Sequence, residues 1–463
     1  MKRLLGLLIV GAIVTGAVVL PEPPAAPGPE FIGPEVRESV ASATASVWYC
    51  PWVASGALRD SRLMLSANVP VDAELTLPQQ LADEAPDEAE VGLDDAGALV
   101  VDIGEIVRRG DTPLFIEFSD GPAAAAAVVS SVEILTGDTC VARIPKIWEL
   151  PGGTTREGRT LTVRLFNPFP ELAKVSVSGS SESGETGLVD LQNLDVQART
   201  WLDVNLNTLV PLLDELSLTV TSSEGFVIPS LVVAGLTDEA SWPGVAPASS
   251  WEFPVATVSA EFSPSLMLTN AGAAAVVATI DVYTADGSTI GAREVEVLPS
   301  VPRRIDLSDL ADGAMGIRVR STGPVAAAVI AEEATAVLEP TDEEGEVDEG
   351  TTAGDRIAGT VGISRPSSTW LLPGLSAVPD ADSTLWLLNT GTETATVTLQ
   401  PLGVRRLIAT KQSVAPGTTV GIPLGFDVTV GGYFVESTAP ISISWSAESA
   451  SGLMFVTGTV VDE

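Results

Sequence analysis

The segment Ser367-Ser-Thr-Trp-Leu-Leu-Pro-Gly374 carries a Trp-x-x-Pro pattern that occurs four times in the 463-residue chain. The four tryptophans are spaced by 100, 103 and 119 residues and are Trp48, Trp148, Trp251 and Trp370. A period near 100 residues is typical of a small β-sandwich, whereas a propeller blade needs only about 40–50 residues. The repetition therefore predicts four similar units in tandem.

A second landmark follows each tryptophan at a nearly constant distance. An apolar run such as Leu385-Trp-Leu-Leu-Asn389 ends in asparagine 20, 19, 19 and 19 residues after the respective tryptophan, at Asn68, Asn167, Asn270 and Asn389. Runs of alternating apolar and polar residues come next, and this period of two indicates β-strands. Short turns rich in Ser, Gly and Pro separate further strands, at residues 119–122, 222–225, 321–324 and 437–440.

These patterns predict an all-β protein: a tandem array of four immunoglobulin-like β-sandwich repeats behind an N-terminal transmembrane helix. The expected units span residues 43–143, 144–246, 247–366 and 367–463. Tandem domains share limited interfaces by default, so we expect the units to flex against one another. The third unit is longer because an acidic insertion begins at Glu332, and a shorter acidic run occupies residues 83–90. Both acidic runs are expected to be flexible hairpin tips.

One stretch poses a conflict between local and repeated signals. Five alanines from Ala123 to Ala127 favour a helix by intrinsic propensity. They align, however, with Val325–Ile330 and Ile441–Trp445, which we interpret as strands. We therefore predict a strand at the alanine run.

The N-terminus carries an export signal. Lys2 and Arg3 precede an uncharged run from Leu4 to Leu20, which is slightly short for a membrane span and slightly long for the core of a cleaved signal peptide. We expect residues 1–20 to be a signal anchor, with a cleaved signal peptide as the alternative, and residues 21–42 to be a proline-rich linker. The expected location is the plasma membrane, single-pass with the C-terminal part outside the cytoplasm, or the secreted fraction if the segment is cleaved.

Cys50 and Cys140 are the two cysteines of the chain. Because disulfides form in exported proteins, we expect these two residues to be joined, with two separate buried thiols as the alternative.

Composition restricts the chemistry. With no histidine, the chain cannot build a Ser-His-Asp nucleophile, an imidazole zinc site or a histidine-held haem. The net charge of −37 excludes nucleic acid as a partner, because nucleic-acid binders present basic surfaces. The acidic runs do not match an EF-hand calcium loop. We expect no enzyme activity, no cofactor and no bound metal.

The units resemble a repeat of secreted and surface proteins of actinobacteria and related bacteria. Its pattern runs Ala-Pro-x-Thr-Thr-Trp-Tyr-x-Ala-Glu-Gly, then about a dozen residues, then an apolar run ending in Asn-Pro. Residues Ser364–Gly374 with Trp386–Asn389, and Trp148–Gly152 with Asn167-Pro168, carry the likeness. From Ala43 onward, the chain looks like an actinobacterial family of exported, membrane-anchored all-β proteins of unknown function.

The resemblance has one gap. Where the repeat has Ala-Glu, this chain has Cys50-Pro51, Leu150-Pro151, Phe253-Pro254 and Leu372-Pro373. Any role of that glutamate therefore does not carry over. The resemblance implies an envelope protein and no known activity.

Candidate site residues fall into three groups. We expect the repeated Trp48, Trp148, Trp251 and Trp370 to pack in the cores rather than to form a row of sugar-stacking platforms. We expect Asn68, Asn167, Asn270 and Asn389 to close the turns at strand ends. The tryptophans outside the repeat are expected to face outward as possible ligand contacts, and these are Trp52, Trp201, Trp242 and Trp386.

The expected function is that of a non-enzymatic extracytoplasmic envelope protein that serves as a structural or binding scaffold. The expected partners are the membrane, through the N-terminal helix, and an envelope protein or cell-wall glycan; the oligomeric state stays open. One alternative is a lectin-like binder of cell-wall polysaccharide. The other is a glycoside hydrolase that depends on carboxylates, which would need two of these groups about 5–9 Å apart.

Overall fold

The computed structural model describes residues 46–461, apart from 56–58, 80–84, 94–96, 107–109, 120, 258, 260, 312, 334–355, 375–377, 379, 404–408 and 425–430. The chain divides into two compact units, Met1–Val40 and Ala41–Glu463. The predicted signal anchor and most of the linker belong to the first unit and lie outside the described residues. In the described part, no helix is long and apolar enough to cross a membrane.

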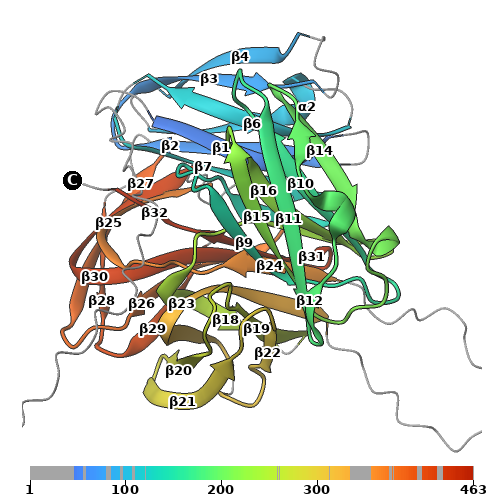
Figure 1. The fold of residues 1–463 in the computed structure, drawn as a ribbon. Coiled ribbons are helices and arrows are strands. Elements are labelled where there is room, and N and C mark those ends of the chain that lie inside the picture. Colours follow the sequence, from blue (N-terminus) through green and yellow to red (C-terminus); the bar gives the residue numbers. More distant parts are fainter. Residues whose placement is uncertain are drawn as a thin grey trace, which may run out of the picture. The chain divides into compact units, whose positions relative to one another are not determined.

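Most of the described structure consists of antiparallel strands, with very little helix (Figure 1), as predicted for an all-β protein. We group the strands into four segments that follow the four Trp-x-x-Pro motifs. Segment 1 contains β1 Ser46–Ser55, β2 Asp60–Ala67, β3 Val71–Leu77, β4 Asp87–Leu93, β5 Ala98–Asp102, the helix α2 Ile103–Ile106, β6 Gly110–Phe118, β7 Ala123–Ser130 and β8 Leu135–Thr139.

Segment 2 is the one with additional short 3-10 helices. It contains β9 Ile147–Gly153, β10 Thr160–Asn167, β11 Ala173–Ser181, β12 Gly184–Thr186, η1 Val189–Leu191, β13 Leu194–Val196, β14 Thr200–Asn205, η2 Leu206–Thr208, β15 Leu216–Glu224, β16 Ile228–Ala234 and β17 Glu239–Pro243.

Segments 3 and 4 each contain one very long strand. Segment 3 contains β18 Ala248–Thr257, β19 Phe262–Thr269, β20 Val276–Thr284, β21 Gly287–Val297, β22 Arg303–Asp306, β23 Met315–Glu333 and β24 Ile357–Val361. Segment 4 contains β25 Ser367–Pro373, β26 Asp382–Asn389, β27 Ala395–Leu402, β28 Thr410–Val414, β29 Thr418–Leu424, β30 Gly432–Ser449, β31 Gly452–Thr457 and β32 Thr459–Val460.

The same strand order recurs in all four segments. In segment 1 the two sheets are β1-β6-β3-β4 and β5-β2-β7-β8, and in segment 2 they are β9-β15-β11-β12 and β14-β10-β16-β17. In segments 3 and 4, the long strands β23 and β30 occupy the sixth and seventh places and pass from one sheet into the other. Each segment is therefore a two-sheet structure.

This strand order differs from the immunoglobulin-like order that we expected. In the immunoglobulin fold the seventh strand joins the sheet of the third and sixth strands. Here the seventh strand pairs instead with the second, as β7 does with β2 and β16 with β10. The period-two signal identified the strands but carries no information about which strand pairs with which.

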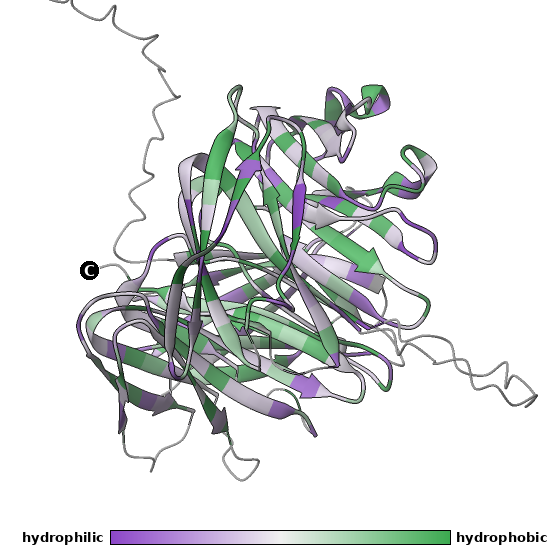
Figure 2. Cartoon of the chain, turned by 90° about the horizontal axis from the view of Figure 1, so that it is seen from below, coloured by the Kyte–Doolittle hydropathy of each residue, from purple (hydrophilic) through white to green (hydrophobic). Residues whose placement is uncertain are grey.

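The alanine run forms strand β7, as predicted. Strand β7 lies between β2 and β8, and its side chains are buried. Ala125 and Ala127 belong to the core of segment 1, while Ala126 and Val128 face the opposite way and pack in the cluster of segment 4. The small side chains thus let two layers approach β7 from both sides, and this tertiary packing overrides helix propensity. Figure 2 shows apolar and polar residues alternating along many strands.

Contacts between the segments form a closed cycle. The strands that pair with the seventh place of each segment are β8, β17, β24 and β31; they contact one another in this order, and β31 also contacts β8. Between segments 4 and 1, the backbone N–H of Thr457 donates to Oγ1 of Thr139 at 3.0 Å. Between segments 2 and 3, the N–H of Ile357 donates to a carboxylate oxygen of Asp238 at 2.8 Å. The expectation of limited interfaces between the units is therefore wrong for the described part of the chain.

A repeated contact between first and second strands underlies the cycle. Strand β1 packs against β10, β9 against β19, β18 against β26, and β25 of segment 4 against β2 of segment 1. At the centre of the second strands lie Met64, Arg164, Met267 and Trp386. Each of these residues occupies the same position, between the two apolar residues that face its own core.

The contact between segments 4 and 1 closes the cycle, and it requires a glycine. Gly374 has a φ of +84°, and a Cβ at this position would overlap Sδ of Met64, which is fully buried. We expect Gly374→Ala to destabilise the protein by about 2–3 kcal/mol, because both overpacking and a left-handed backbone disfavour the methyl group. Urea unfolding measures the loss.

Gly184 provides the matched control for that substitution. Its φ is +110°, and a Cβ there would have nothing within 4 Å. Gly184→Ala therefore carries the backbone cost of about 1 kcal/mol alone. Equal losses for the two variants would contradict the proposed role of Gly374 in closing the cycle.

Candidate functional site

Cys50 and Cys140 form a disulfide. The bond joins β1 to the residue that follows β8. It therefore connects both ends of segment 1, and both residues lie in the apolar core of that segment.

The four repeated tryptophans lie inside the segments. Trp48, Trp148, Trp251 and Trp370 are 6%, 2%, 3% and 0% exposed. Each belongs to the hydrophobic cluster of its own segment. Their rings are therefore not accessible as platforms for a sugar.

Three of the four repeated asparagines make one shared set of bonds. In Asn270, Nδ2 donates to the carbonyl oxygens of Ala274 and Val297 at 2.8 and 3.0 Å, and Oδ1 accepts from the N–H of Gly272 at 2.9 Å. Asn167 and Asn389 repeat this pattern. Asn68, whose distance from its tryptophan is one residue longer, is exposed.

Three of the four tryptophans expected to face solvent are buried, so the expectation is wrong for them. Trp52 is 3% exposed and packs with Val129 and with Val232 of segment 2. Trp386 packs at the contact between segments 3 and 4, and Nε1 of Trp242 donates to the carbonyl oxygen of Pro151. The interfaces between segments cover these rings. Trp201 alone of the four is partly exposed, and the guanidinium carbon of Arg164 lies 5.6 Å from the centre of its ring.

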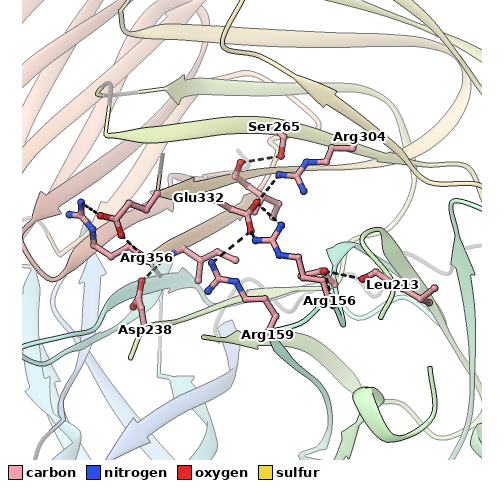
Figure 3. A network of polar contacts seen from close by, with 12 residues as sticks. Arg156, Arg159, Leu213, Asp238, Ser265, Arg304, Glu332 and Arg356 are labelled. Atoms are coloured by element: carbon pink, nitrogen blue, oxygen red, sulfur yellow. Dashed lines mark hydrogen bonds and ion pairs between the residues drawn. The ribbon is translucent and has the colours of Figure 1, made fainter. Parts of the chain in front are cut away.

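A polar network joins segments 2 and 3, and we call it the Glu332 network (Figure 3). Glu332, near the end of β23, accepts hydrogen bonds from Arg156 at 2.5 Å and from Arg304 at 2.7 Å. Nη2 of Arg159 lies 3.9 Å from the same carboxylate. Arg156 and Arg159 belong to the loop between β9 and β10, so three arginines from two segments surround one carboxylate.

The charges determine the state of Glu332. Burial favours the neutral carboxyl, but the hydrogen bonds and positive charges of Arg304 and Arg156 outweigh that effect and lower the pKa of Glu332 below its ordinary value. The carboxylate therefore stays ionised near neutral pH. It acts as a charged clamp between the segments rather than as a proton donor.

Arg356 extends the polar contacts towards segment 4. Its Nη2 donates to Glu333 and to Glu261, both at 2.9 Å, and its Nη1 donates to the carbonyl oxygen of Ser449 at 3.4 Å. The guanidinium carbon lies 5.0 Å from the ring centre of Phe262. Arg356 thus connects segments 3 and 4 where β24 begins.

Buried carboxyl groups lie at the other interfaces as well. Asp138 of segment 1 accepts a bond from Ser241 of segment 2 at 3.2 Å, and burial raises the pKa of Asp138 well above its ordinary value. Glu252 of segment 3 accepts bonds from Thr390 at 2.8 Å and from Ser442 at 2.6 Å, both in segment 4. These groups bind neighbouring segments to each other.

Sequence reasoning did not identify the Glu332 network or the interface carboxyl groups. Glu149 and Glu252 occupy the same position inside Trp-x-x-Pro. A charged residue beside a core tryptophan on a strand ordinarily indicates a face exposed to solvent, so the repeat pattern did not signal the burial of these two groups. Among the described residues, no cluster of three or more His, Cys, Asp or Glu side chains could hold a metal ion.

Replacing Glu332 tests the clamp. In Glu332→Gln the three guanidinium groups lose the negative charge that balances them. We therefore expect the free energy of unfolding at pH 7 to fall by about 2–3 kcal/mol. Because the pKa of Glu332 is lowered, its contribution is present above the ordinary glutamate pKa and is lost as the pH falls through the lowered value. Urea unfolding at pH 7 and pH 3 should show the difference from wild type shrinking in acid.

The exposed pair of Lys174 and Glu224 serves as the control, since its side chains are 40% and 62% exposed. Glu224→Gln should change the free energy of unfolding by at most about 0.5 kcal/mol. A loss of this small size for Glu332→Gln would show that the network contributes no more than a surface pair.

Comparison with known proteins identifies the family. No curated protein matches the chain. The solved structure "Crystal Structure of Thermotoga maritima 1070" matches 26% of this chain and 96% of its own chain, at 18% identity and a TM-score of 0.20. The model of a family of unknown function, DUF5719, matches residues 108–336 and 240–452. These two overlapping matches cover most of the sequence, and the chain therefore belongs to this family of unknown function.

Proposed function

We propose that the protein is a non-enzymatic scaffold of the bacterial cell envelope, held outside the membrane by its N-terminal segment. The closed cycle of contacts among the four segments is the observation that carries the proposal. Because each segment contacts two neighbouring segments, the loops of the four segments lie at fixed distances from one another. Such an arrangement is suited to a scaffold that presents binding loops. We further propose that the four segments are copies of one actinobacterial surface repeat.

The burial of the chemically interesting groups supports a passive role. Glu149 and Glu252, whose position repeats, are 0% and 1% exposed. A carboxyl group that catalyses glycoside hydrolysis must reach the substrate, and these two groups are covered by protein. The Glu332 carboxylate is held by arginines and remains ionised.

A lectin-like function is the second candidate, and Trp201 is the residue that favours it. Trp201 is partly exposed on β14. The guanidinium group of Arg164 lies near its ring and donates two hydrogen bonds of 2.7 Å to the carboxylate of Asp203. A ring held in this way could stack on a sugar. The burial of Trp52, Trp242 and Trp386 leaves no row of such rings.

A pull-down on isolated cell-wall polysaccharide separates the two functions. The chain from Glu30 onward contains the compact unit Ala41–Glu463. Under the scaffold proposal it should not be retained at high salt. Retention that Trp201→Ala abolishes would establish the lectin-like function, whereas Ile290→Ala, a change at a 62% exposed residue of β21, should have no effect in either case.

Cell fractionation tests the proposed location. Because the apolar run from Leu4 to Leu20 is expected to remain attached, the intact chain should sediment with the membranes. Alkaline carbonate should leave it there, while a peripheral protein would be released. Recovery from the medium of a chain that begins after about residue 17 would contradict the anchor.

A further inference from the structure

Glu149 is a buried carboxyl group that lacks one hydrogen-bond partner. It lies on β9 within the second Trp-x-x-Pro motif and is 0% exposed. Oγ1 of Thr219 donates to its Oε2 at 3.0 Å. No hydrogen-bond partner for Oε1 is found among the residues that the structure describes. An unsatisfied buried oxygen is costly, and much more so when it carries charge.

The equivalent residue of segment 3 shows what Glu149 lacks. Glu252 accepts hydrogen bonds from Thr390 and Ser442, which belong to the following segment, and Arg318 lies 3.5 Å away. Glu149 lies in the same place at the contact between segments 2 and 3, where β9 packs against β19 and β23. The two interfaces can therefore be compared residue by residue.

The comparison identifies the substituted partners. Thr390 follows Asn389, and the residue that follows Asn270 is Ala271. Ser442 pairs with Leu388, the residue before Asn389. In segment 3 the residue before Asn270 is Thr269, and it pairs with Ala326. Two hydroxyl donors at one interface are thus replaced by two methyl groups at the other. The buried surroundings of Glu149 therefore favour a neutral carboxyl group over an ionised one.

The elements packed against β9 provide no compensating charge. Strands β16 and β19 contain no ionisable residue. On β15 the one ionisable residue is Glu224, and it pairs with Lys174. The charged residues of β23 also have partners other than Glu149. These pairs are Arg318 with Glu252, Arg320 with Asp281, Glu332 with Arg156 and Arg304, and Glu333 with Arg356. Lys146, just before β9, lies over the ring of Phe226. Burial accordingly raises the pKa of Glu149 from 4.5 to about 8, against a smaller opposing effect of the bond from Thr219.

We propose that Glu149 makes the contact between segments 2 and 3 depend on pH, because the closed contact accepts this carboxyl group in its protonated form. Between about pH 5 and 8 the contact is tightest at the acid end, where Glu149 is protonated and Glu332, whose pKa is lowered, is still ionised. When the segments separate, water reaches the carboxyl group and its pKa returns towards the ordinary 4.5. Opening therefore releases a proton between these two pKa values, and it becomes easier as the pH rises from about 5 to 8. Above about 8 the dependence ends, since both forms are ionised.

Amide hydrogen exchange of the full chain, followed by mass spectrometry, tests the proposal. After division by the intrinsic exchange rates, exchange in β9 and β19 should rise by about tenfold per pH unit over this range, as expected for one released proton. Exchange in β3 and β27, which lie away from this contact, should stay constant. In Glu149→Gln, whose amide does not titrate, exchange in β9 and β19 should also stay constant.

A second variant keeps the test decisive should Glu149→Gln fail to fold. Ala326→Ser restores the hydroxyl that Ser442 provides to Glu252, so the ionised carboxylate gains a donor. The range of pH over which exchange rises should then end at a lower pH. The matched control Glu252→Gln should retain the wild-type response in β9 and β19.

Two outcomes would overturn the proposal. One is the same corrected pH dependence of exchange in wild type and in Glu149→Gln. The other is an equal rise in all strands, because that result describes global unfolding and not the opening of one contact.

Discussion

The structure depends on one contact that is used four times: the second strand of a segment packs against the first strand of its neighbour. Such a contact joins two different surfaces, so it generates either an open filament or a closed cycle. Here it closes after four segments, because β2 packs on β25 and β8 on β31. Every segment therefore has both of its interacting surfaces covered within the chain. This is why residues at the outer faces of the sheets, such as Met64 and Trp386, are as buried as core residues.

The four interfaces share geometry but differ in chemistry. Met64, Leu371 and Met454 make the contact of segments 4 and 1 largely apolar. The contact of segments 3 and 4 encloses Glu252 together with the two hydroxyl groups that donate to it. The contact of segments 2 and 3 encloses Glu149, and one of its carboxylate oxygens has no hydrogen-bond partner among the described residues. Between segments 1 and 2, Nη1 of Arg59 lies 3.0 Å from Glu239, and burial raises the pKa of this carboxyl group despite the opposing charge of Arg59. Burying a charge costs free energy that only good pairing offsets. The four contacts therefore respond differently to pH and salt.

The sequence predicted the strands and the repeated unit well, for a physical reason. Side chains alternate between faces with a period of two, and Trp370 with Asn389 marks a core position and a turn that local bonds create. The pairing of strands and the contacts between segments were not predictable in this way. The other segments have no tryptophan at the positions of Trp386 and Trp52, and burial by another segment is a property of the assembled chain. Asn68 shows the limit within the pattern itself, because one extra residue moves it out to solvent.

A closed cycle also changes what the loss of a single contact means. Three of the four contacts join segments that follow one another in the chain, and the fourth joins the two ends of the array. Once three contacts have formed, the fourth forms within one body, at a high effective concentration. Closure of the cycle therefore adds to the apolar packing and to the hydrogen bonds between Thr139 and Thr457 that hold segments 4 and 1 together. Conversely, segments 2 and 3 cannot swing apart as rigid bodies while the other three contacts stay unchanged, because the cycle fixes their separation. The opening that ionised Glu149 favours is therefore a local one, in which water reaches the carboxyl group between β9 and β19 while the other three contacts hold the segments in place.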